Sequence, residues 1–499
     1  MTRSLNPETS AGTGIVELGH NRECFFDNYL FLPSRTTAKL KIHQPVYQDT
    51  VMVHDQPWEG DGCDFYNFFF DDRFPGVDGK HPKGVYRMYY LGWQMPGAEP
   101  DSKPAKGITA CYMESSDGIH WVRPELGILK FDGSTRNNIV LNAELNDRID
   151  NFMVFRDDNP ACPPNARYKG IGKSREGLRY YPSADGLHFR RGGIITGKGA
   201  FDSLNVVFWD REACVYRGYI RGFHPAAMLN PMNESVRDIS YIESKDFKKW
   251  TDPRLLVFDD GEDIPLYTNN VIPYFRAPRI YVGTPSRYIN RFQWNGSFDE
   301  LCGKAKRKRR MTMKPRYGVV TTDCAFIVSR DGRSFSRFGE AFMRPGPENG
   351  LNWVYGDCYP ARGFAVTPSR IPGAPDELSL YAPSGHWMND PTKLNRYTIR
   401  MDGFASLNAG DTEAMAVTRP FTYAGKEMHI NFATSALGYV YVTLIDADGN
   451  RYPSCETFGD AIDRKVRFDN RKAVAALSGK PVVLEFRMRD ADIYSMQFR

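Results

Sequence analysis

The sequence predicts an all-β protein, a five-bladed β-propeller followed by a C-terminal β-sandwich. Three observations support this prediction. A strand–strand–turn–strand unit recurs five times between about residues 55 and 402, long helical periodicity is absent, and regularly alternating strands follow residue 402. We therefore place the propeller at residues 1–402 and the sandwich at 403–499.

A turn motif marks four of the five repeats. The pattern is Ser-x-Asp-(Gly)-x-x-aromatic, and each copy follows an apolar, strand-like run. The copies begin at Ser115, Ser183, Ser244 and Ser329. Asp accepts hydrogen bonds from the backbone ahead of it, and Gly tolerates positive φ, so the motif predicts a hairpin turn. His120 and His188 lie inside two copies, and we interpret both as structural.

Two further strand series precede each turn. The inner strands begin near Phe65, Asn151, Asn205, Asn270 and Tyr359, and the second strands begin near Val85, Arg167, Val215, Arg279 and Leu378. The fifth repeat lacks the turn motif. We expect an N-terminal strand such as Cys24–Phe31 to close the ring.

The C-terminal segment alternates apolar and polar residues, as strands of a β-sandwich do. Arg396–Phe404 connects it to the fifth repeat without a Pro/Ser/Gly-rich spacer. A short ordered link favours a fixed interface, so we expect the sandwich to pack on the propeller and leave its central funnel open.

Composition narrows the classes of partner. The net charge is only +5 on 499 residues, and the one dense basic run, Lys304–Arg310, lacks interleaved aromatics. We interpret that run as a solvated loop and expect no nucleic-acid partner. The 9 cysteines are scattered without zinc spacing, and no stretch has the length of a signal-peptide core or a membrane span.

These absences predict a cytoplasmic protein with reduced thiols, no membrane partner and no cofactor. The prediction leaves room for a structural cation in the propeller channel. The oligomeric state stays open.

Polar residues stand where the inner strands begin. In a propeller these positions face the mouth of the central channel. They are Asp64, Asp150, Asn151, Asp202, Asn205, Asn269, Asn270 and Asp357. Two carboxylates across a sugar are the minimum for glycoside hydrolysis, and a third can raise the pKa of the acid. Several acidic residues around one funnel therefore predict a carbohydrate site, although a single Asp there could equally cap a turn.

Basic and aromatic residues extend the candidate site. The arginines flanking inner strands could bind a carboxylate, sulfate or phosphate, or form salt bridges between blades. They are Arg221, Arg237, Arg276 and Arg287. Trp58, Trp93 and Trp353 lie near strand ends, where they could stack on sugar faces or pack in the core.

One segment resembles a known enzyme family. Phe201–Asp210 (FDSLNVVFWD) is similar to the Arg-Asp-Pro-x-Val-Phe segment of glycoside hydrolase family 32 and its five-bladed relatives. The resemblance implies that Asp202 stabilises the transition state. Phe201 and Ser203 replace the family's Arg and Pro.

A second segment, Glu262–Tyr267 (EDIPLY), resembles the family's Glu-Cys-Pro-x-Leu-Phe after a shift of one residue. This resemblance implies that Glu262 or Asp263 is the general acid.

The family's opening Trp-Met-Asn-Asp-Pro motif, which carries the nucleophile, is absent before the first repeat. Candidates for nucleophile or base near that point are Asp27, Asp55, Glu59 and Asp64. The same string occurs at Trp387–Pro391, in the fifth repeat, where we interpret it as coincidence.

Nearly the whole chain is similar to bacterial proteins labelled glycosyl hydrolase family 32-like. The resemblance implies a glycoside hydrolase that acts on an oligosaccharide, exo-acting on a furanoside or related sugar. The alternatives are a glycoside phosphorylase and a non-catalytic carbohydrate-binding propeller.

Overall fold

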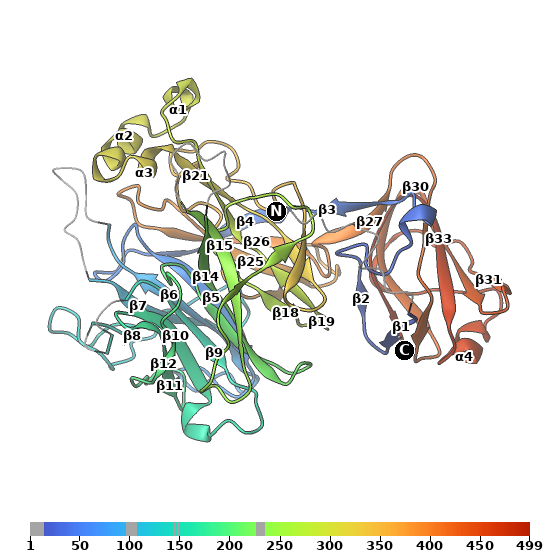
Figure 1. Ribbon diagram of the computed structural model, residues 1–499, viewed down its shortest axis with the longest axis horizontal. Coiled ribbons are helices and arrows are strands. Elements are labelled where there is room, and N and C mark those ends of the chain that lie inside the picture. The colour runs from blue at the N-terminus through green and yellow to red at the C-terminus, as the bar shows by residue number, and fades with distance from the viewer. Residues whose placement is uncertain (1–13, 96–106, 144, 147–148, 226–234) are drawn as a thin grey trace.

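The computed structural model describes residues 14–95, 107–143, 145–146, 149–225 and 235–499. Figure 1 shows a larger body of β-sheets joined to a smaller one that carries the C-terminus. The larger body is the predicted five-bladed propeller, in which each blade is an antiparallel sheet of at least four strands, with one added parallel strand in the fourth.

The first three blades each use four consecutive strands. Blade I contains β5 (Asp64–Asp71), β6 (Val85–Gly92), β7 (Thr109–Ser115) and β8 (Ile139–Leu141). Blade II contains β9 (Phe152–Arg156), β10 (Tyr168–Ser174), β11 (Gly177–Ser183) and β12 (Ile194–Thr196). Blade III contains β13 (Val206–Asp210), β14 (Val215–His224), β15 (Val236–Ser244) and β16 (Arg254–Leu255).

Blade IV contains β18 (Ile272–Tyr274), β19 (Ala277–Gly283), β22 (Ile327–Ser329) and β23 (Ser334–Arg337), with β17 (Val257–Phe258) parallel to β23. Between β19 and β22 the chain inserts a hairpin, β20 (Ser286–Asn290) and β21 (Val320–Cys324), that carries three helices. They are α1 (Gly296–Glu300), α2 (Lys304–Met313) and α3 (Arg316–Val319).

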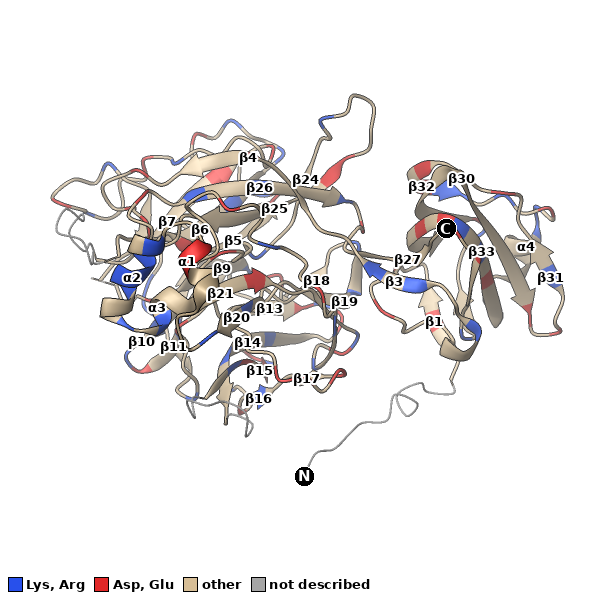
Figure 2. Cartoon of the chain, turned by 90° about the horizontal axis from the view of Figure 1, so that it is seen from above, with Lys and Arg blue, Asp and Glu red and all other residues tan. Residues whose placement is uncertain are grey.

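The basic run is therefore helical and not the loop expected from sequence. Figure 2 shows its Lys and Arg residues gathered on α2. Arg307 and Arg310, three residues apart on one face, are buried. The helix packs this face inward, so only part of the run is solvated.

Blade V contains β24 (Ala365–Thr367), β25 (Glu377–Ser384), β26 (Lys393–Arg400) and β4 (Val46–Val53). The ring is thus closed by an N-terminal strand, but the expected segment Cys24–Phe31 was wrong. Glu23–Cys24 instead pairs with Ser495 and Met496 near the C-terminus, because Phe25 and Phe31 bury their rings in the smaller body.

The smaller body is a ten-stranded sheet around its own apolar core, in the form expected for a β-sandwich. Its later strands are β27 (Ala405–Ala409), β28 (Ala414–Val417), β29 (Phe421–Tyr423), β30 (Met428–Asp446), β31 (Arg451–Pro453), β32 (Asp460–Lys465) and β33 (Val482–Phe498), with α4 (Ala473–Leu477). Three N-terminal strands, β1 (Val16–Gly19), β2 (Glu23–Cys24) and β3 (Lys39–Ile42), join the same sheet. Residues 16–42 thus pair with this sheet and not with a blade.

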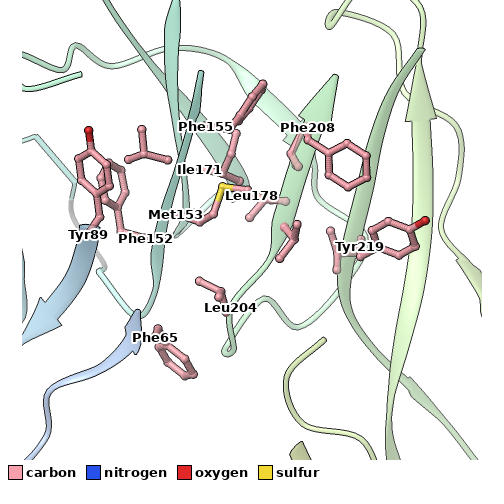
Figure 3. Packing of buried hydrophobic residues seen from close by; sticks show 14 of the residues in the cluster. Phe65, Tyr89, Phe152, Met153, Phe155, Ile171, Leu178, Leu204, Phe208 and Tyr219 are labelled. Carbon is pink, nitrogen blue, oxygen red and sulfur yellow. The ribbon is translucent and has the colours of Figure 1, made fainter. Parts of the chain in front are cut away.

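The main apolar core runs through the first blades. Figure 3 shows Phe65, Phe152, Met153, Leu204 and Phe208 of successive inner strands and their approaches packed together. Apolar side chains from neighbouring blades therefore share one core, which binds the blades laterally.

The repeated Ser-x-Asp segments form the predicted turns, and they also link neighbouring blades. In the first copy the Asp117 carboxylate accepts hydrogen bonds from the backbone N–H groups of Ile119 and His120, both at 2.8 Å. The turn carbonyls accept tyrosine hydroxyls from neighbouring blades, as Tyr89 donates to Gly186 at 2.9 Å and Tyr219 to Gly332 at 2.8 Å.

Buried asparagine amides connect the inner strands. Asn67 on β5 has no exposed surface, donates to the Phe152 carbonyl at 2.9 Å and accepts from the Val154 N–H at 2.9 Å, both on β9. An unpaired buried backbone group costs about 1–3 kcal/mol. A single amide that satisfies both groups therefore fixes the spacing of blades I and II.

The same device recurs around the ring. The Asn205 amide donates to the Asn151 side chain at 3.3 Å, which links blades III and II. Asn269 donates to the Leu204 carbonyl at 3.1 Å, and Asn270 donates to the Pro360 carbonyl at 2.6 Å. Between blades V and I the backbone itself bonds, because Arg362 exchanges N–H and C=O contacts with residues 66 and 68 at 2.9 and 2.8 Å.

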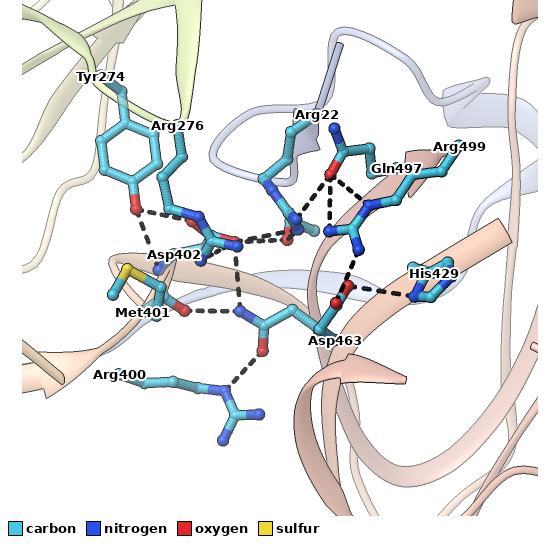
Figure 4. Close-up of polar contacts among 12 residues, drawn as sticks. Arg22, Tyr274, Arg276, Arg400, Met401, Asp402, His429, Asp463, Gln497 and Arg499 are labelled. Atoms are coloured by element: carbon cyan, nitrogen blue, oxygen red, sulfur yellow. Dashed lines mark hydrogen bonds and ion pairs between the residues drawn. The ribbon is translucent and has the colours of Figure 1, made fainter. Parts of the chain in front are cut away.

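The two bodies meet at a buried carboxylate, Asp402 (Figure 4). It accepts hydrogen bonds from Tyr274 of the propeller and Ser495 of the sandwich, both at 2.7 Å. Arg276 lies 3.1 Å and Arg22 3.5 Å from its oxygens. This charged centre and the surrounding aromatic core, which includes Phe26, Phe326 and Phe404, give the junction a defined geometry.

We predict that Asn67→Ala lowers the free energy of unfolding by about 2–5 kcal/mol. The substitution removes the partner of a buried carbonyl and a buried N–H, and it leaves a cavity. Urea unfolding followed by tryptophan fluorescence measures the change. Asn165→Ala, at an exposed position of blade II, is the control and should stay within about 0.5 kcal/mol of wild type. An equal response of the two variants would contradict the role given to Asn67.

We predict that Asp402→Asn destabilises the protein by about 3–5 kcal/mol, because the buried guanidinium of Arg22 and its neighbour Arg276 lose their counter-charge. Differential scanning calorimetry should show the sandwich melting apart from the propeller. Asp448→Asn, in an exposed turn of the sandwich, is the control. A wild-type melting profile for Asp402→Asn would refute the junction's dependence on this charge.

Candidate functional site

Three aspartates stand where inner strands begin. Asp64 opens β5, Asp150 stands two residues before β9, and Asp202 lies in the approach to β13. The amide links described above hold these strand starts side by side, so the carboxylates share one end of the propeller, which we call the upper end. This grouping is the one that the sequence predicts.

Aromatic rings lie among these carboxylates. Tyr267 donates its hydroxyl to the Asp202 carbonyl at 3.1 Å. Tyr359 stacks on Tyr267 with ring centroids 5.4 Å apart and on Phe65 with centroids 6.3 Å apart. Sequence analysis did not propose either tyrosine as a site residue, although Tyr359 marks an expected strand start and Tyr267 ends the Glu262–Tyr267 segment.

Asp64 is the most perturbed of the three acids. It is buried, and burial together with the nearby Asp150 carboxylate raises its pKa well above the usual range. Its Oδ1 atom has no hydrogen-bond partner among the residues that the structure describes. Burial and the neighbouring charge therefore both favour the protonated form of Asp64.

The other two acids are more exposed and each faces a cation. The Nζ atom of Lys173 lies 3.1 Å from the Asp150 carboxylate. The Arg221 guanidinium lies 3.4 Å from the Asp202 carboxylate, whose side chain is 42% exposed. The upper end thus combines a buried acid of raised pKa with two ion-paired carboxylates.

Backbone strain coincides with these positions. Phe65, Phe201, Asn270 and Cys358 all have φ between 52° and 58°, an unusual conformation for residues other than glycine. Each lies beside one of the polar positions at a strand start. Strain of this kind costs about 1–3 kcal/mol per residue and is concentrated at functional sites.

A histidine between two carboxylates lies at the end of β14. His224 Nδ1 is 3.0 Å from the Asp238 carboxylate, and Nε2 is 2.8 Å from that of Asp263. Burial raises the pKa of Asp238. Asp263 is therefore one arm of an acid–histidine–acid chain, which sequence analysis missed. Both Asp263 and its neighbour Glu262 are exposed.

Asp357 lies beneath the helical insertion. Its carboxylate accepts the Val354 N–H at 2.8 Å, and burial raises its pKa to about 7, against the influence of Arg307 and Arg310. At 3% exposure it supports the segment that leads to Tyr359 and offers little surface to a substrate.

Two further predicted acids, Glu59 and Asp55, are held by neighbouring side chains. Glu59 is fully buried and accepts hydrogen bonds from Tyr90 at 2.5 Å and His54 at 3.1 Å, beside β4. Against the effect of burial, His54, Arg123 and Tyr90 lower its pKa. Together with the Gln56 N–H these donors occupy its oxygens. Glu59 is structural, and Asp55 pairs with the same Arg123 at 3.2 Å.

Asp27 lies at the junction between the two bodies. It binds Arg330 at 2.7 Å, and Glu23 binds the same guanidinium at 2.8 Å. The expectation that Asp27 is a nucleophile was wrong, because its segment belongs to the sandwich.

Other predicted substrate contacts are structural. Arg276 pairs with Asp402, and Arg287 forms a two-point ion pair with Asp323 at 2.6 Å. Trp58 donates to Asn138 at 2.7 Å inside blade I. Four predicted asparagines are nearly fully buried and donate hydrogen bonds to neighbouring blades. They are Asn151, Asn205, Asn269 and Asn270.

The remaining tryptophans extend the aromatic region. Trp93 contacts Trp387 with ring centroids 6.0 Å apart, and Trp387 in turn lies 4.8 Å from Tyr355. Trp353 donates to the Gly346 carbonyl at 2.8 Å. The buried Asp61 accepts the Asn389 N–H at 2.9 Å, which ties the Trp387–Pro391 string to blade I.

Within the described residues, no group of three or more His, Cys, Asp or Glu side chains could hold a metal ion. No described helix is long and apolar enough to cross a membrane.

No protein-family model matches the chain, and no curated protein matches it either. Solved structures that share parts of the fold include a glycoside hydrolase family 43 arabinoxylan arabinofuranohydrolase from Bacillus subtilis (11% identity, 99% of this chain and 98% of that chain, TM-score 0.34). A glycoside hydrolase family 32 β-fructofuranosidase from Bombyx mori (9%, 92% and 95%, 0.36) also matches.

A third match is an N-acetylgalactosamine deacetylase from F. plautii in complex with blood group B trisaccharide (12%, 73% and 96%, 0.41). TM-scores below 0.5 at such identities carry no inference about activity. The chemistry of this chain has to come from its own residues.

Proposed function

We propose that this protein is a glycoside hydrolase whose reaction takes place at the upper end of the propeller. The observation that carries the proposal is that a buried Asp64 with a raised pKa and a partly exposed, ion-paired Asp202 stand at strand starts of the same end. Glycoside hydrolysis needs one carboxylic acid that gives a proton and one carboxylate that attacks or activates water.

Each residue receives a role from its surroundings. Asp64 protonates the leaving oxygen, and Asp150 holds the pKa of Asp64 high by like-charge repulsion. Asp202, held by Arg221, faces the positive charge that develops on the sugar and acts as nucleophile or base. Tyr267 and Tyr359 supply apolar ring faces of the kind on which sugars stack. The sugar we favour is a furanoside or related unit at the end of an oligosaccharide.

We predict that Asp202→Asn and Asp64→Asn each lower kcat by roughly 10²–10⁴-fold, because each removes a proton-transfer or charge-stabilising group. Melting temperature should change little in Asp202→Asn, whose side chain is partly exposed. Substrates come from a panel of aryl furanosides, aryl pyranosides and oligosaccharides. Asp132→Asn, in an exposed turn of blade I, is the control. Full turnover by Asp202→Asn would remove that residue from the mechanism.

We predict that Asp150→Asn shifts the basic limb of the pH–kcat/KM profile to lower pH. The acid works only when protonated, so activity falls as pH rises through the pKa of Asp64, and loss of the Asp150 charge lowers that pKa. Asp132→Asn should leave the profile in place. A basic limb that stays put or moves upward in Asp150→Asn would show that Asp64 is not the acid.

A further inference from the structure

The upper end also carries an excess of positive charge beside Asp202. Arg221 lies on β14 and Arg237 on β15. In the antiparallel ladder of β14 and β15, Arg221 lies directly opposite Ile239. Arg237 is two residues from Ile239 on the same strand, so the side chains of Arg221 and Arg237 lie on the same face of blade III. The neighbouring Asp238 lies on the opposite face, where it pairs with His224.

Both guanidinium groups rest on tyrosine rings. The Cζ atom of Arg221 is 4.5 Å from the centroid of Tyr267, and that of Arg237 is 3.8 Å from the centroid of Tyr288. The two tyrosine rings are 5.9 Å apart. A third cation, Arg316 of α3, reaches the Tyr288 hydroxyl at 3.5 Å. Three guanidinium groups from two blades thus converge on one tyrosine pair.

Two of these guanidinium groups carry buried N–H groups without a hydrogen-bond acceptor. The side chain of Arg221 is 1% exposed, yet its Nε has no acceptor among the described residues, and its Nη1 has only the ion pair with the Asp202 Oδ1 atom at 3.4 Å. The buried Nε of Arg237 is also without an acceptor in the described part of the chain. Buried guanidinium donors left unpaired are costly, and planar forks of this kind suit carboxylate, sulfate or phosphate.

The ion pairs around these arginines also favour a bound anion. Asp202 forms an ion pair with Arg221, and no carboxylate among the described residues forms one with Arg237 or Arg316. By contrast, Arg276 and Arg287 each form an ion pair with an aspartate. Sequence analysis had grouped these two arginines with Arg221 and Arg237. The upper end therefore has a local surplus of cations that its own residues do not neutralise.

We propose that Arg221, Arg237 and Arg316 bind an oxyanion next to the reacting sugar. This inference rests on the proposed function, because Asp202 joins the two sites through Arg221. The oxyanion has two sources with the same chemistry, an acidic substituent of the substrate (a uronate, sulfate or phosphate ester) or free inorganic phosphate.

Calorimetric titration of the full chain with inorganic phosphate, sulfate and methyl glucuronide, with methyl glucoside as the neutral probe, tests the proposal. Wild type should bind the anions and not the neutral glycoside. The double variant Arg237→Gln/Arg316→Gln should bind them at least about tenfold more weakly, since charge-assisted hydrogen bonds are lost. Arg237→Lys should restore part of the affinity and guards against a folding defect.

Arg254→Gln is the matched control, because it removes the same charge from exposed β16 at the outer edge of the same blade. Absence of anion binding by wild type, or equal binding by the double variant, would overturn the proposal. Titration of the Asp64→Asn protein separates the two ideas, since the oxyanion should still bind when turnover is lost.

Turnover assays then assign the source. A rate that rises with added phosphate identifies a free co-substrate. A kcat/KM that is higher for an acidic aryl glycoside than for its neutral counterpart identifies a substituent. Either result supports the site, and the two results separate phosphorolysis from hydrolysis of an acidic glycan.

Discussion

The arrangement of the upper end depends on buried amides that join one inner strand to the next. A propeller has no covalent bond between inner strands, and its apolar core resists sliding only weakly because apolar contacts are non-directional. An asparagine that donates to one strand and accepts from it fixes both distance and register. Asn67 satisfies two backbone groups of β9 in this way. Asn269 and Asn270 add donated bonds to carbonyl groups of neighbouring blades.

Carboxylates at the strand starts inherit their positions from this framework. Asp64 and Asp202 are separated by more than a hundred residues of chain, yet their strands are held in the same ring of hydrogen bonds. A fixed frame keeps Asp64 buried and close to the Asp150 carboxylate, and burial together with this like charge raises the pKa of Asp64. The strained backbone at Phe65 and Phe201 is tolerated for the same reason, because the surrounding bonds over-determine it.

The sequence was informative where structure repeats. Five units, their turns and their strand order follow from patterns that recur, and the propeller was predicted on that basis. The recurring strand starts also made Asp64, Asp150 and Asp202 candidates, and their roles stay predictions. A contact that occurs only once in the chain leaves no repeating pattern in the sequence. The four donors around Glu59 and the sharing of Arg330 by Asp27 come from contacts between distant segments, which a pattern of residue types does not reveal.

The asparagines at the strand starts also show what a sequence pattern leaves undecided. Their positions at strand starts were predicted, but an amide there can bind a sugar or a neighbouring strand equally well, and only burial decides between the two. Tyr267 and Tyr359 were missed because their importance lies in stacking against each other across blades, with no local motif. The helical α2 was missed because Lys and Arg are good helix formers as well as typical loop residues.

The path of residues 16–53 has a consequence for the way the chain acquires its structure. The segments β1–β3 pair with strands beyond residue 400, and β4 pairs with β26, so the earliest-made strands find partners only among the last-made ones. On a ribosome that adds about 5–20 residues per second, these strands wait with open edges while most of the polypeptide emerges. Unpaired edges are sites of aggregation. The propeller therefore closes only after β26 has been made, and the smaller body only after β33 has been made. These long-range pairings predict slow refolding from denaturant.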